Sequence, residues 1–374
     1  MSPLRKRHQT TTSDLAPEVR KGRLRELRTE LEQRSVDALL TLSLPHIRYL
    51  SGFSGSNGLV VVTPRRALIV TDGRYTEQVR EESSGFAVRI SRDSLVDELP
   101  KSSILSGISR IAIEHAVMPV AIFARLQKLF PRKKFVPSAG IVESLASVKH
   151  ESEIAHIRAA AAITDAVFRE MLDVVREGMT ESEVAAELTY RQRRRGSEGD
   201  AFEPIVAAGE HAALPHAHAS NRPLRNGDLV VLDFGCRVRG YHSDLTRTIA
   251  LGRPSSELRK VYGVVRDAQQ RALEHCAVAL PARALDAVAR THIRRAGFGK
   301  FFPHSLGHGL GLQIHEEPRI SARSTATLAA GNVITIEPGV YVPGLGGVRI
   351  EDDVVLRTSG PEILTHAPKD LIVL

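Results

Sequence analysis

The stretch Leu-Val-Val-Leu-Asp-Phe-Gly-Cys-Arg-Val-Arg-Gly-Tyr-His-Ser-Asp at residues 229–244 carries two aspartates in a setting that predicts strands. Asp233 interrupts an apolar run, and Asp244 closes the stretch. A second strand pattern follows at residues 246–250. Two glycines between the aspartates permit a tight reversal, so we expect a hairpin that brings both carboxylates to one site.

Two more acidic residues occur at strand positions further along the chain. Glu337 ends the run Val-Ile-Thr-Ile at residues 333–336, and Glu351 follows Val-Arg-Ile at residues 348–350. A buried carboxylate is costly unless something compensates its charge. A cation shared between the acidic residues is the simplest compensation.

His308 would add a different kind of ligand to the same site. It stands between Gly307 and Gly309, and glycines on both sides let the backbone and a metal approach closely. Four carboxylates and one imidazole suit Mn²⁺, Co²⁺ or Zn²⁺ better than a structural zinc finger, which would need thiolates. Two such ions can acidify a water molecule and stabilise a tetrahedral oxyanion. The sequence therefore predicts a two-metal hydrolase.

The chain divides into segments of different character around this site. Residues 1–20 are polar and aperiodic, and we expect a flexible leader. Alternating strand and helix patterns predict an α/β domain over residues 21–145. Residues 146–374 combine long amphipathic helices with hairpin-like strands, which predicts an α+β domain.

The expected elements follow from apolar periodicity and turn residues. In the first domain we expect strands at residues 38–42, 58–62, 67–70 and 111–113, and helices at residues 19–34, 75–82 and 119–130. In the second we expect strands at residues 229–235, 246–250, 333–337, 339–342 and 348–355, and helices at residues 151–176, 180–194, 256–279 and 284–295. Thr180 followed by Glu183 predicts a capping box at the start of the second of these helices.

The composition fits an ordinary globular chain, since 42% of the 374 residues are hydrophobic and 25% are charged. The net charge of +8 raises the question of nucleic acid. However, the basic runs lack interleaved aromatic residues, so we expect solvated helix faces and no nucleic-acid partner. Two cysteines favour a reducing compartment. Without an apolar signal region or a run of ~18–20 apolar residues, we expect a cytoplasmic protein that does not contact a membrane.

These motifs resemble those of the methionine aminopeptidase/prolidase/aminopeptidase P family, the M24-type "pita-bread" metallopeptidases. Over residues 145–374 the resemblance rests on Leu-Asp-Phe-Gly at 232–235, Ser-Asp-Leu-Thr-Arg-Thr at 243–248, His-Ser-Leu-Gly-His-Gly-Leu-Gly-Leu at 304–312, His-Glu-Glu-Pro at 315–318, Ile-Glu-Pro-Gly at 336–339 and Arg-Ile-Glu-Asp at 349–352. Together these motifs are highly specific, although each alone would be weak.

The first domain resembles the creatinase/prolidase N-terminal domain. It does so through Ile-Arg-Tyr-Leu-Ser-Gly-Phe-Ser-Gly-Ser at residues 47–56 and Thr-Asp-Gly-Arg-Tyr-Thr at residues 71–76. Methionine aminopeptidases lack that domain, so the resemblance points to the Xaa-Pro branch. It implies an N-terminal α/β domain followed by a pita-bread catalytic domain.

The resemblance also implies a role for each metal ligand. Asp233 would hold one ion, and His308 and Glu337 the other. Asp244 and Glu351 would bridge the two ions. Glu337 would also accept the proton of the attacking water and pass it to the leaving nitrogen.

Four further residues match functional positions of the family. His216 would contact the substrate near the metals, and His315 would stabilise the tetrahedral intermediate. His304 would be a further active-site histidine. Arg349 would not bind metal itself but would contact the metal ligands and help to hold them in place. We therefore expect catalysis from His216, His304, His315 and Glu337, and substrate binding from the three histidines and Arg349.

The resemblance implies a homodimeric exopeptidase with two divalent ions per subunit, Mn²⁺ foremost and Co²⁺ or Zn²⁺ as alternatives. Its substrate would be a peptide with proline in second position, from which it releases the first residue. The motifs of the first domain favour aminopeptidase P over prolidase, which acts only on Xaa-Pro dipeptides.

Two alternatives belong to other classes. A creatinase-like, metal-independent C–N hydrolase would have lost the ligands, whereas this sequence keeps all five. A catalytically inactive, peptidase-like binding module gains some support from the net charge, but the complete ligand set opposes it.

Overall fold

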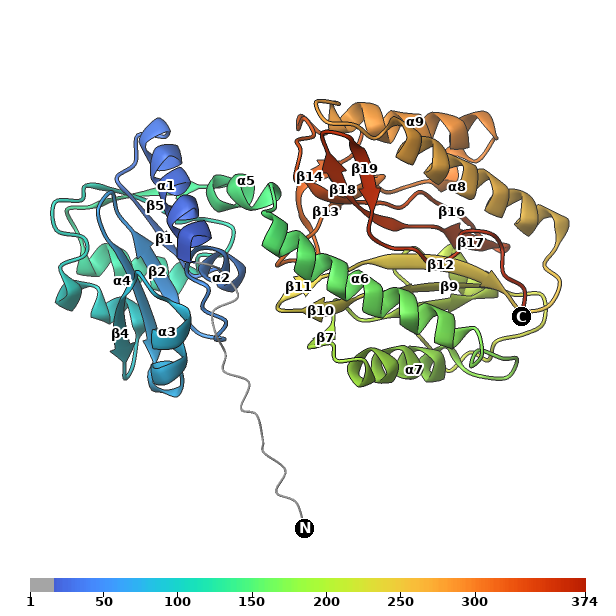
Figure 1. Ribbon diagram of the computed structural model, residues 1–374, viewed down its shortest axis with the longest axis horizontal. Helices are drawn as coiled ribbons and strands as arrows, with labels where there is room; N and C mark the ends of the chain where they lie inside the picture. The colour runs from blue at the N-terminus through green and yellow to red at the C-terminus, as the bar shows by residue number, and fades with distance from the viewer. Residues whose placement is uncertain (1–16) are drawn as a thin grey trace, which may run out of the picture. The chain divides into compact units, whose positions relative to one another are not determined.

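The computed structural model describes residues 17–374 and divides into two compact units, with the division between Ala146 and Ser147 (Figure 1). Residues 1–16 of the predicted leader lie outside the described residues. Its remaining residues belong to helix α1 (Pro17–Gln33). Within residues 17–374, no helix has the length and apolar character that crossing a membrane requires.

The first unit is built on a six-stranded sheet with the order β4-β3-β2-β1-β5-β6. Its strands are β1 (Ala38–Thr41), β2 (Leu59–Val62), β3 (Ala67–Asp72), β4 (Ala87–Ser91), β5 (Arg110–Glu114) and β6 (Lys134–Ser138). β2 runs antiparallel to both of its neighbours, whereas the pairs β3–β4, β1–β5 and β5–β6 are parallel. The carboxyl ends of β1, β5 and β6 therefore lie at the same edge of the sheet.

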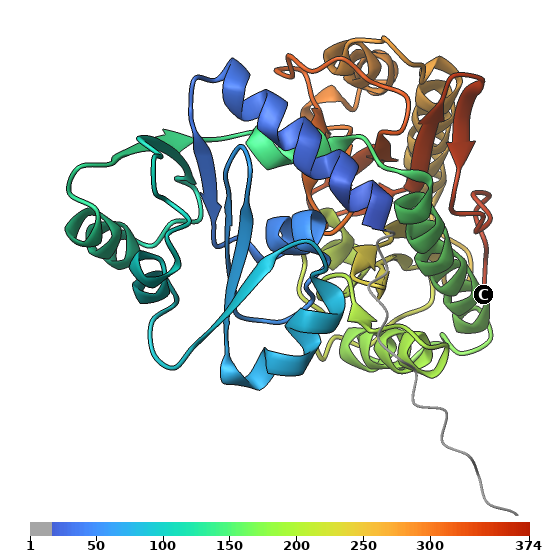
Figure 2. The ribbon, with the colours of Figure 1, turned by 60° about the vertical axis from the view of Figure 1, so that its left-hand side comes forward.

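Helices follow the strands of this unit as expected for an α/β domain. They are α2 (Leu44–Ser51), α3 (Thr76–Glu82), α4 (Val120–Leu129) and α5 (Ile141–Ser147), with short 3-10 turns η1 (Gly73–Tyr75), η2 (Leu95–Glu98) and η3 (Pro100–Ser102). Helix α1, predicted at residues 19–34, lies across the sheet (Figure 2) and buries Leu24, Leu27 and Leu31, which recur at helical spacing.

The structure confirms the four strands predicted in this unit, and it adds β4 and β6. These two strands lie at the edges of the sheet and are only partly buried. Their sequences, Ala-Val-Arg-Ile-Ser and Lys-Phe-Val-Pro-Ser, lack a continuous apolar run for that reason. Helices α2 and α5 were also not predicted, because eight and seven residues are too few to show a clear periodicity.

The second unit contains four long helices and several small antiparallel sheets. The helices are α6 (Glu151–Met171), α7 (Glu181–Arg194), α8 (Ser256–His275) and α9 (Ala282–Arg295), with 3-10 turns η4 (Gly209–Ala213) and η5 (Gly299–Phe301). Two three-stranded sheets contain β7 (Gly199–Asp200), β8 (Ile205–Ala208), β9 (Leu229–Phe234), β10 (Cys236–Val238), β11 (Tyr241–His242) and β12 (Leu245–Ala250). The remaining sheets contain β13 (Gly307–Gly309), β14 (Glu316–Ile320), β15 (Val333–Ile336), β16 (Gly339–Val342), β17 (Gly346–Arg349), β18 (Asp352–Arg357) and β19 (Gly360–Ile363).

The strands of this unit lie between two pairs of helices (Figure 1). One apolar core packs α8 and α9 against β15, β16, β17 and β18. Another packs α6 and α7 against β8, β9 and β12. Asp233 lies within β9, whereas Asp244, Glu337 and Glu351 lie directly beside strand ends, so the predicted strand positions of Glu337 and Glu351 are wrong by one or two residues. Helices cover these strands on both sides.

The predicted capping box at the start of α7 is confirmed. The backbone N–H of Glu183 donates to the Thr180 hydroxyl at 3.2 Å, and the backbone N–H of Thr180 donates to the Glu183 carboxylate at 2.7 Å. We expect Thr180→Ala to lower the free energy of unfolding by about 1 kcal/mol, because the helix loses its cap. Urea denaturation measures this change. Thr180→Ser keeps the acceptor, and equal losses in the two variants would contradict the capping role.

Candidate metal centre

The predicted hairpin forms around Asp233 and Asp244. β9 and β12 pair antiparallel with Thr246 opposite Asp233, and β10 and β11 form the turn between them. The turn requires Gly235, because a Cβ atom there would lie 1.8 Å from the carbonyl oxygen of Ser243. Asp233 and Asp244 are both buried. The hairpin thus places two carboxylates in the interior of the second unit.

His308 lies on β13 between two glycines that let the neighbouring strands approach. A Cβ atom on Gly307 would lie 2.0 Å from the carbonyl oxygen of Thr335, and one on Gly309 would lie 2.2 Å from that of Glu317. The Nδ1 atom of His308 lies 2.9 Å from the carbonyl oxygen of Gly309, which can only accept a hydrogen bond. Nδ1 therefore donates, and Nε2 is the nitrogen that faces the acidic residues.

The structure brings the other predicted ligands to this nitrogen. His308 Nε2 lies 3.3 Å from Oε1 of Glu337 and 3.8 Å from Oδ2 of Asp244. One ligand atom each of Asp244, His308 and Glu351 lies within 4.8 Å of the other two. The hydroxyl of Thr246 fixes Glu351 by donating to its Oε2 at 2.6 Å. Residues more than a hundred positions apart in the sequence therefore meet in one place.

The carboxylates of this cluster strongly affect one another. Burial, and then the charges of neighbouring carboxylates, raises the pKa of Asp244 and Glu351 well above their ordinary values. Burial also raises the pKa of Asp233, although the Arg349 guanidinium opposes this rise. Glu337 differs: burial raises its pKa, but the hydrogen bond and charge of His308 outweigh this and lower it to about 2.

The residues present fit a pair of divalent cations. The buried oxygens Asp233 Oδ1, Asp244 Oδ1 and Glu351 Oε1 receive no hydrogen bond from the described part of the chain. Unpaired buried acceptors of this kind are costly, and several carboxylates in one small volume repel one another. Divalent cations would satisfy the free oxygens and remove the repulsion, and the mixture of carboxylates with one imidazole suits Mn²⁺, Co²⁺ or Zn²⁺.

Arg349 supports the cluster from one side. It is buried and contacts the carboxylate of Asp233. It also donates to the Tyr341 hydroxyl at 2.6 Å and to the carbonyl oxygen of Pro215 at 3.2 Å. Arg349 therefore connects Asp233 to the loop that carries His216.

The three predicted histidines lie in different environments. The ring centroids of His315 and His308 lie 4.3 Å apart, and the two rings meet edge to face. His304 is more deeply placed, and its Nε2 lies 2.9 Å from the Tyr341 hydroxyl. Burial, and then the charge of Arg349, lowers the pKa of His304. His315 keeps contact with solvent, and its pKa is lowered by the partial loss of that contact and then by the neighbouring His308. His216 is exposed, so the structure places it at the outer side of the cluster.

Three residues in contact with the cluster were not predicted from the sequence: Thr246, Tyr341 and Asp353. Asp353 is buried and accepts a hydrogen bond from the backbone N–H of Asp244 at 2.9 Å. Tyr341 links His304 to Arg349 through its hydroxyl, whose pKa burial raises to about 12. A threonine or tyrosine in a strand looks like an ordinary core residue. Asp353 could have been found, because it directly precedes the apolar residues 354–356 of the same strand.

We expect Tyr341→Phe to lower the free energy of unfolding by about 1–3 kcal/mol, because it leaves a donor of the buried Arg349 without a partner. Urea denaturation measures this loss. Tyr190→Phe is the matched control, since Tyr190 is 53% exposed and its hydroxyl accepts a hydrogen bond from the exposed Arg194. Similar values for the two variants would show that the Tyr341 hydroxyl does not stabilise the cluster.

Comparison with known proteins agrees with this geometry. Residues 155–358 match the family model of metallopeptidase family M24, and residues 23–148 match that of the creatinase/prolidase N-terminal domain. A protein of Pyrococcus horikoshii named Xaa-Pro dipeptidase is 36% identical over 343 residues, which cover 91% of this chain and 96% of the relative.

Two solved structures are also similar over nearly the whole chain. The Xaa-Pro dipeptidase from Bacillus anthracis has a TM-score of 0.92 at 38% identity and covers 95% of this chain and 100% of its own. The X-Pro aminopeptidase from Thermotoga maritima has a TM-score of 0.85 at 39% identity and covers 92% of this chain and 100% of its own.

Proposed function

The chain belongs to metallopeptidase family M24, with a creatinase/prolidase N-terminal domain and a pita-bread second domain, and on this premise we propose that it is a dinuclear, proline-specific exopeptidase. The observation that carries the proposal is the meeting of four carboxylates and one imidazole from distant parts of the chain, with three buried oxygens that lack a hydrogen bond from the described residues. We take these five side chains as the ligands of two metal ions.

The proposed ligands divide between the two ions. Asp233 would hold one ion, and His308 and Glu337 the other, while Asp244 and Glu351 would bridge them. When bound, a pair of divalent ions lowers the pKa of water and polarises a carbonyl group. Mn²⁺ is the proposed metal, and Co²⁺ and Zn²⁺ are the alternatives for the same ligand set.

The remaining groups would orient the substrate and move a proton. The carboxylate of Glu337 would accept the proton of water and deliver it to the leaving nitrogen of proline. His315, beside His308, would donate a hydrogen bond to the oxygen of the reacting carbonyl group. The exposed His216 would contact the peptide as it enters, and His304 would orient it from the deeper side. Arg349 would hold Asp233 in place through their direct contact.

The chemistry of proline supports the proposed specificity. The amide nitrogen of proline carries no hydrogen, so a peptidase that aligns its substrate through that N–H binds such a bond poorly. A site that instead holds the carbonyl oxygen through metal ions and histidines does not need this donor.

The names of the relatives bear on the choice between dipeptidase and aminopeptidase activity. The motifs of the first domain favoured aminopeptidase P, whereas the relatives from Pyrococcus horikoshii and Bacillus anthracis are named Xaa-Pro dipeptidase. We therefore propose hydrolysis of Xaa-Pro dipeptides as the main activity. The name of the similar Thermotoga maritima structure, an X-Pro aminopeptidase, keeps release of the first residue from longer peptides as the second candidate.

One experiment tests the activity and its metal together. Metal-stripped protein is assayed on an Xaa-Pro dipeptide and on the matching Xaa-Pro-Xaa tripeptide after Mn²⁺, Co²⁺ or Zn²⁺ is added back singly. We expect no activity without metal, and with Mn²⁺ a higher kcat/KM on the dipeptide than on the tripeptide. A higher kcat/KM on the tripeptide would show that the main activity is that of an aminopeptidase and not that of a dipeptidase. Activity that is unchanged by metal removal would contradict both.

Calorimetric titration with Mn²⁺ separates the enzyme from an inactive binding module. We expect binding to the metal-stripped chain, because the ligand set is complete and burial leaves its oxygens unpaired. A module that had lost its catalytic function together with its metals would bind no more Mn²⁺ than the Asp244→Asn/Glu351→Gln chain, in which two of the proposed ligands are neutralised.

A further inference from the structure

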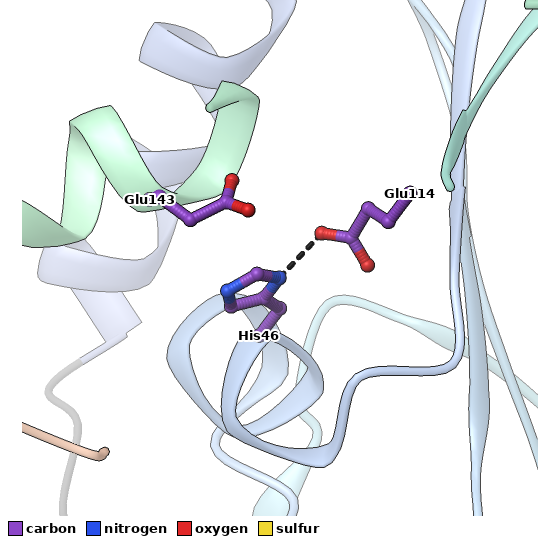
Figure 3. Close-up of side chains that lie close together, drawn as sticks. All are labelled: His46, Glu114 and Glu143. Carbon is purple, nitrogen blue, oxygen red and sulfur yellow. Dashed lines mark hydrogen bonds and ion pairs between the residues drawn. The ribbon is translucent and has the colours of Figure 1, made fainter. Parts of the chain in front are cut away.

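Three metal-ligating side chains also meet in the first unit, apart from the cluster described above. His46 lies on α2, Glu114 ends β5, and Glu143 lies in the first turn of α5. One ligand atom of each residue lies within 4.8 Å of the other two. Figure 3 shows the carboxylates of Glu114 and Glu143 directed toward the imidazole of His46 from two sides.

The topology of the sheet explains why these residues meet. β1, β5 and β6 are parallel neighbours, so their carboxyl ends share one edge of the sheet. Glu114 ends β5 at this edge, α2 follows β1, and α5 follows β6. In open α/β sheets, the region outside the carboxyl ends of the strands is where ligands bind. The cluster therefore occupies a typical binding position of its fold.

Two of the three residues already form a buried pair. The side chains of His46 and Glu114 are 7% and 5% exposed, and Nδ1 of His46 contacts Oε1 of Glu114. The hydroxyl of Thr41 donates to the other carboxylate oxygen, Oε2. Taken alone, these contacts describe an ordinary buried ion pair that needs no further ligand.

Glu143 is the residue that such a pair does not explain. Glu143 is partly exposed, but its Oε2 atom is buried, and none of the residues that the structure describes donates a hydrogen bond to that atom. The carboxylate nevertheless points into the pair, toward a second carboxylate of the same charge (Figure 3). Two carboxylates brought together in a buried region are costly unless a cation lies between them.

We propose that His46, Glu114 and Glu143 bind a divalent cation, Zn²⁺, which ties α5 to α2 and β5. An imidazole with carboxylates is a zinc ligand set, whereas Ca²⁺ and Mg²⁺ prefer oxygen ligands alone. The ion would take the place of the hydrogen-bonding proton between Nδ1 of His46 and Glu114, and that proton would move to Nε2 of the ring or to solvent. Two carboxylates and a neutral imidazole then balance its charge, and a water molecule completes the tetrahedron.

The geometry needs little adjustment for this role. Ligands about 2.0–2.2 Å from a zinc ion lie about 3.3–3.6 Å from one another in a tetrahedron. The three atoms already lie within 4.8 Å of one another, so a small movement of the side chains closes the site. Because α5 ends the first unit, the ion would fasten the helix from which the chain continues into α6.

The test uses the full chain with two proposed catalytic ligands neutralised, Asp244→Asn/Glu351→Gln, so that bound zinc reports mainly on the first unit. Zinc content is measured by mass spectrometry after equilibrium dialysis, and the midpoint of thermal unfolding is measured with and without Zn²⁺. We expect zinc to raise the midpoint, since it binds only the folded chain. Adding Glu143→Gln is expected to weaken zinc binding at least about tenfold, remove one zinc per chain and abolish the shift.

Glu32→Gln is the matched control, because Glu32 is an exposed glutamate on α1. It should bind zinc as the parent does. Glu143→Gln exchanges groups of equal size, and circular dichroism checks that the variant is folded. Equal zinc content and equal shifts in the parent and in Glu143→Gln would overturn the proposal, as would a parent that binds no zinc. Loss of the proposed peptidase activity would leave this result unaffected, because none of the three residues belongs to the catalytic unit.

Discussion

Replacing Asp244 by asparagine is expected to lower kcat/KM on an Xaa-Pro dipeptide by at least about 10³-fold. Asp244 is buried, lies 3.8 Å from Nε2 of His308, and is close to Glu351. As the proposed bridging ligand it would contribute to both metal positions, and its loss removes several kcal/mol of transition-state stabilisation. The measurement is steady-state hydrolysis with saturating Mn²⁺, together with the metal content of the purified variant.

The stability of the metal-free variant separates lost chemistry from lost folding. Burial and neighbouring carboxylates make the Asp244 charge unfavourable without metal, so asparagine should leave the metal-free chain as stable as before or more stable. Asp173→Asn, at an exposed position after α6, is the control for activity. If Asp244→Asn kept the kcat/KM of the unaltered protein, Asp244 would not be a metal ligand.

Arg247→Met is expected to lower the free energy of unfolding by about 3–5 kcal/mol, because breaking a buried ion pair leaves the partner charge uncompensated. Arg247 is 1% exposed and donates to Asp352 at 2.7 Å and to the carbonyl oxygen of Ala367 at 2.7 Å. It also donates to the carbonyl oxygen of Glu351, next to the metal cluster. The loss is measured by urea denaturation.

Arg266→Met is the control for this change. Arg266 forms its ion pairs with Asp267 and Asp370 at the surface, with all three side chains at least 45% exposed. Exposed pairs contribute about 0–1 kcal/mol, so this variant should unfold close to the unaltered protein. A loss of less than about 1 kcal/mol in Arg247→Met, measured beside this control, would show that Arg247 is not needed to hold Glu351 and the start of β18.

The central hairpin could be predicted because its signals are local. An aspartate inside an apolar run indicates a buried charge, and the glycine at 235 indicates a tight turn. Both are explained by the structure, in which Asp233 is buried and any side chain at 235 would meet the backbone of Ser243. The glycines beside His308 predict a close approach of the backbone, and both stand where neighbouring strands approach closely.

The supporting residues could not be predicted because their signals depend on distant parts of the chain. Tyr341 is an ordinary strand residue until Arg349 and His304 are placed beside it. Arg247 follows the first aspartates closely, but the carbonyl oxygens of Glu351 and Ala367 to which it donates lie more than a hundred residues further on. A pattern of apolar and polar residues shows which face of a strand is buried, but not which partner meets a buried polar group.

The cluster in the first unit shows the same limit. The sequence gives no partner for His46, because Glu114 is separated from it by 68 positions and Glu143 lies on a different helix. Only the parallel order of β1, β5 and β6 brings them to one edge of the sheet. Once the topology is known, the grouping follows from where each strand ends.

The most direct test of the account is anomalous X-ray diffraction from crystals of the protein loaded with Mn²⁺. We predict two anomalous peaks about 3.5–4 Å apart in the second unit, contacted by Asp233, Asp244, His308, Glu337 and Glu351. A map with no peak among these five side chains, or with manganese held by other residues of that unit, would contradict the central claim.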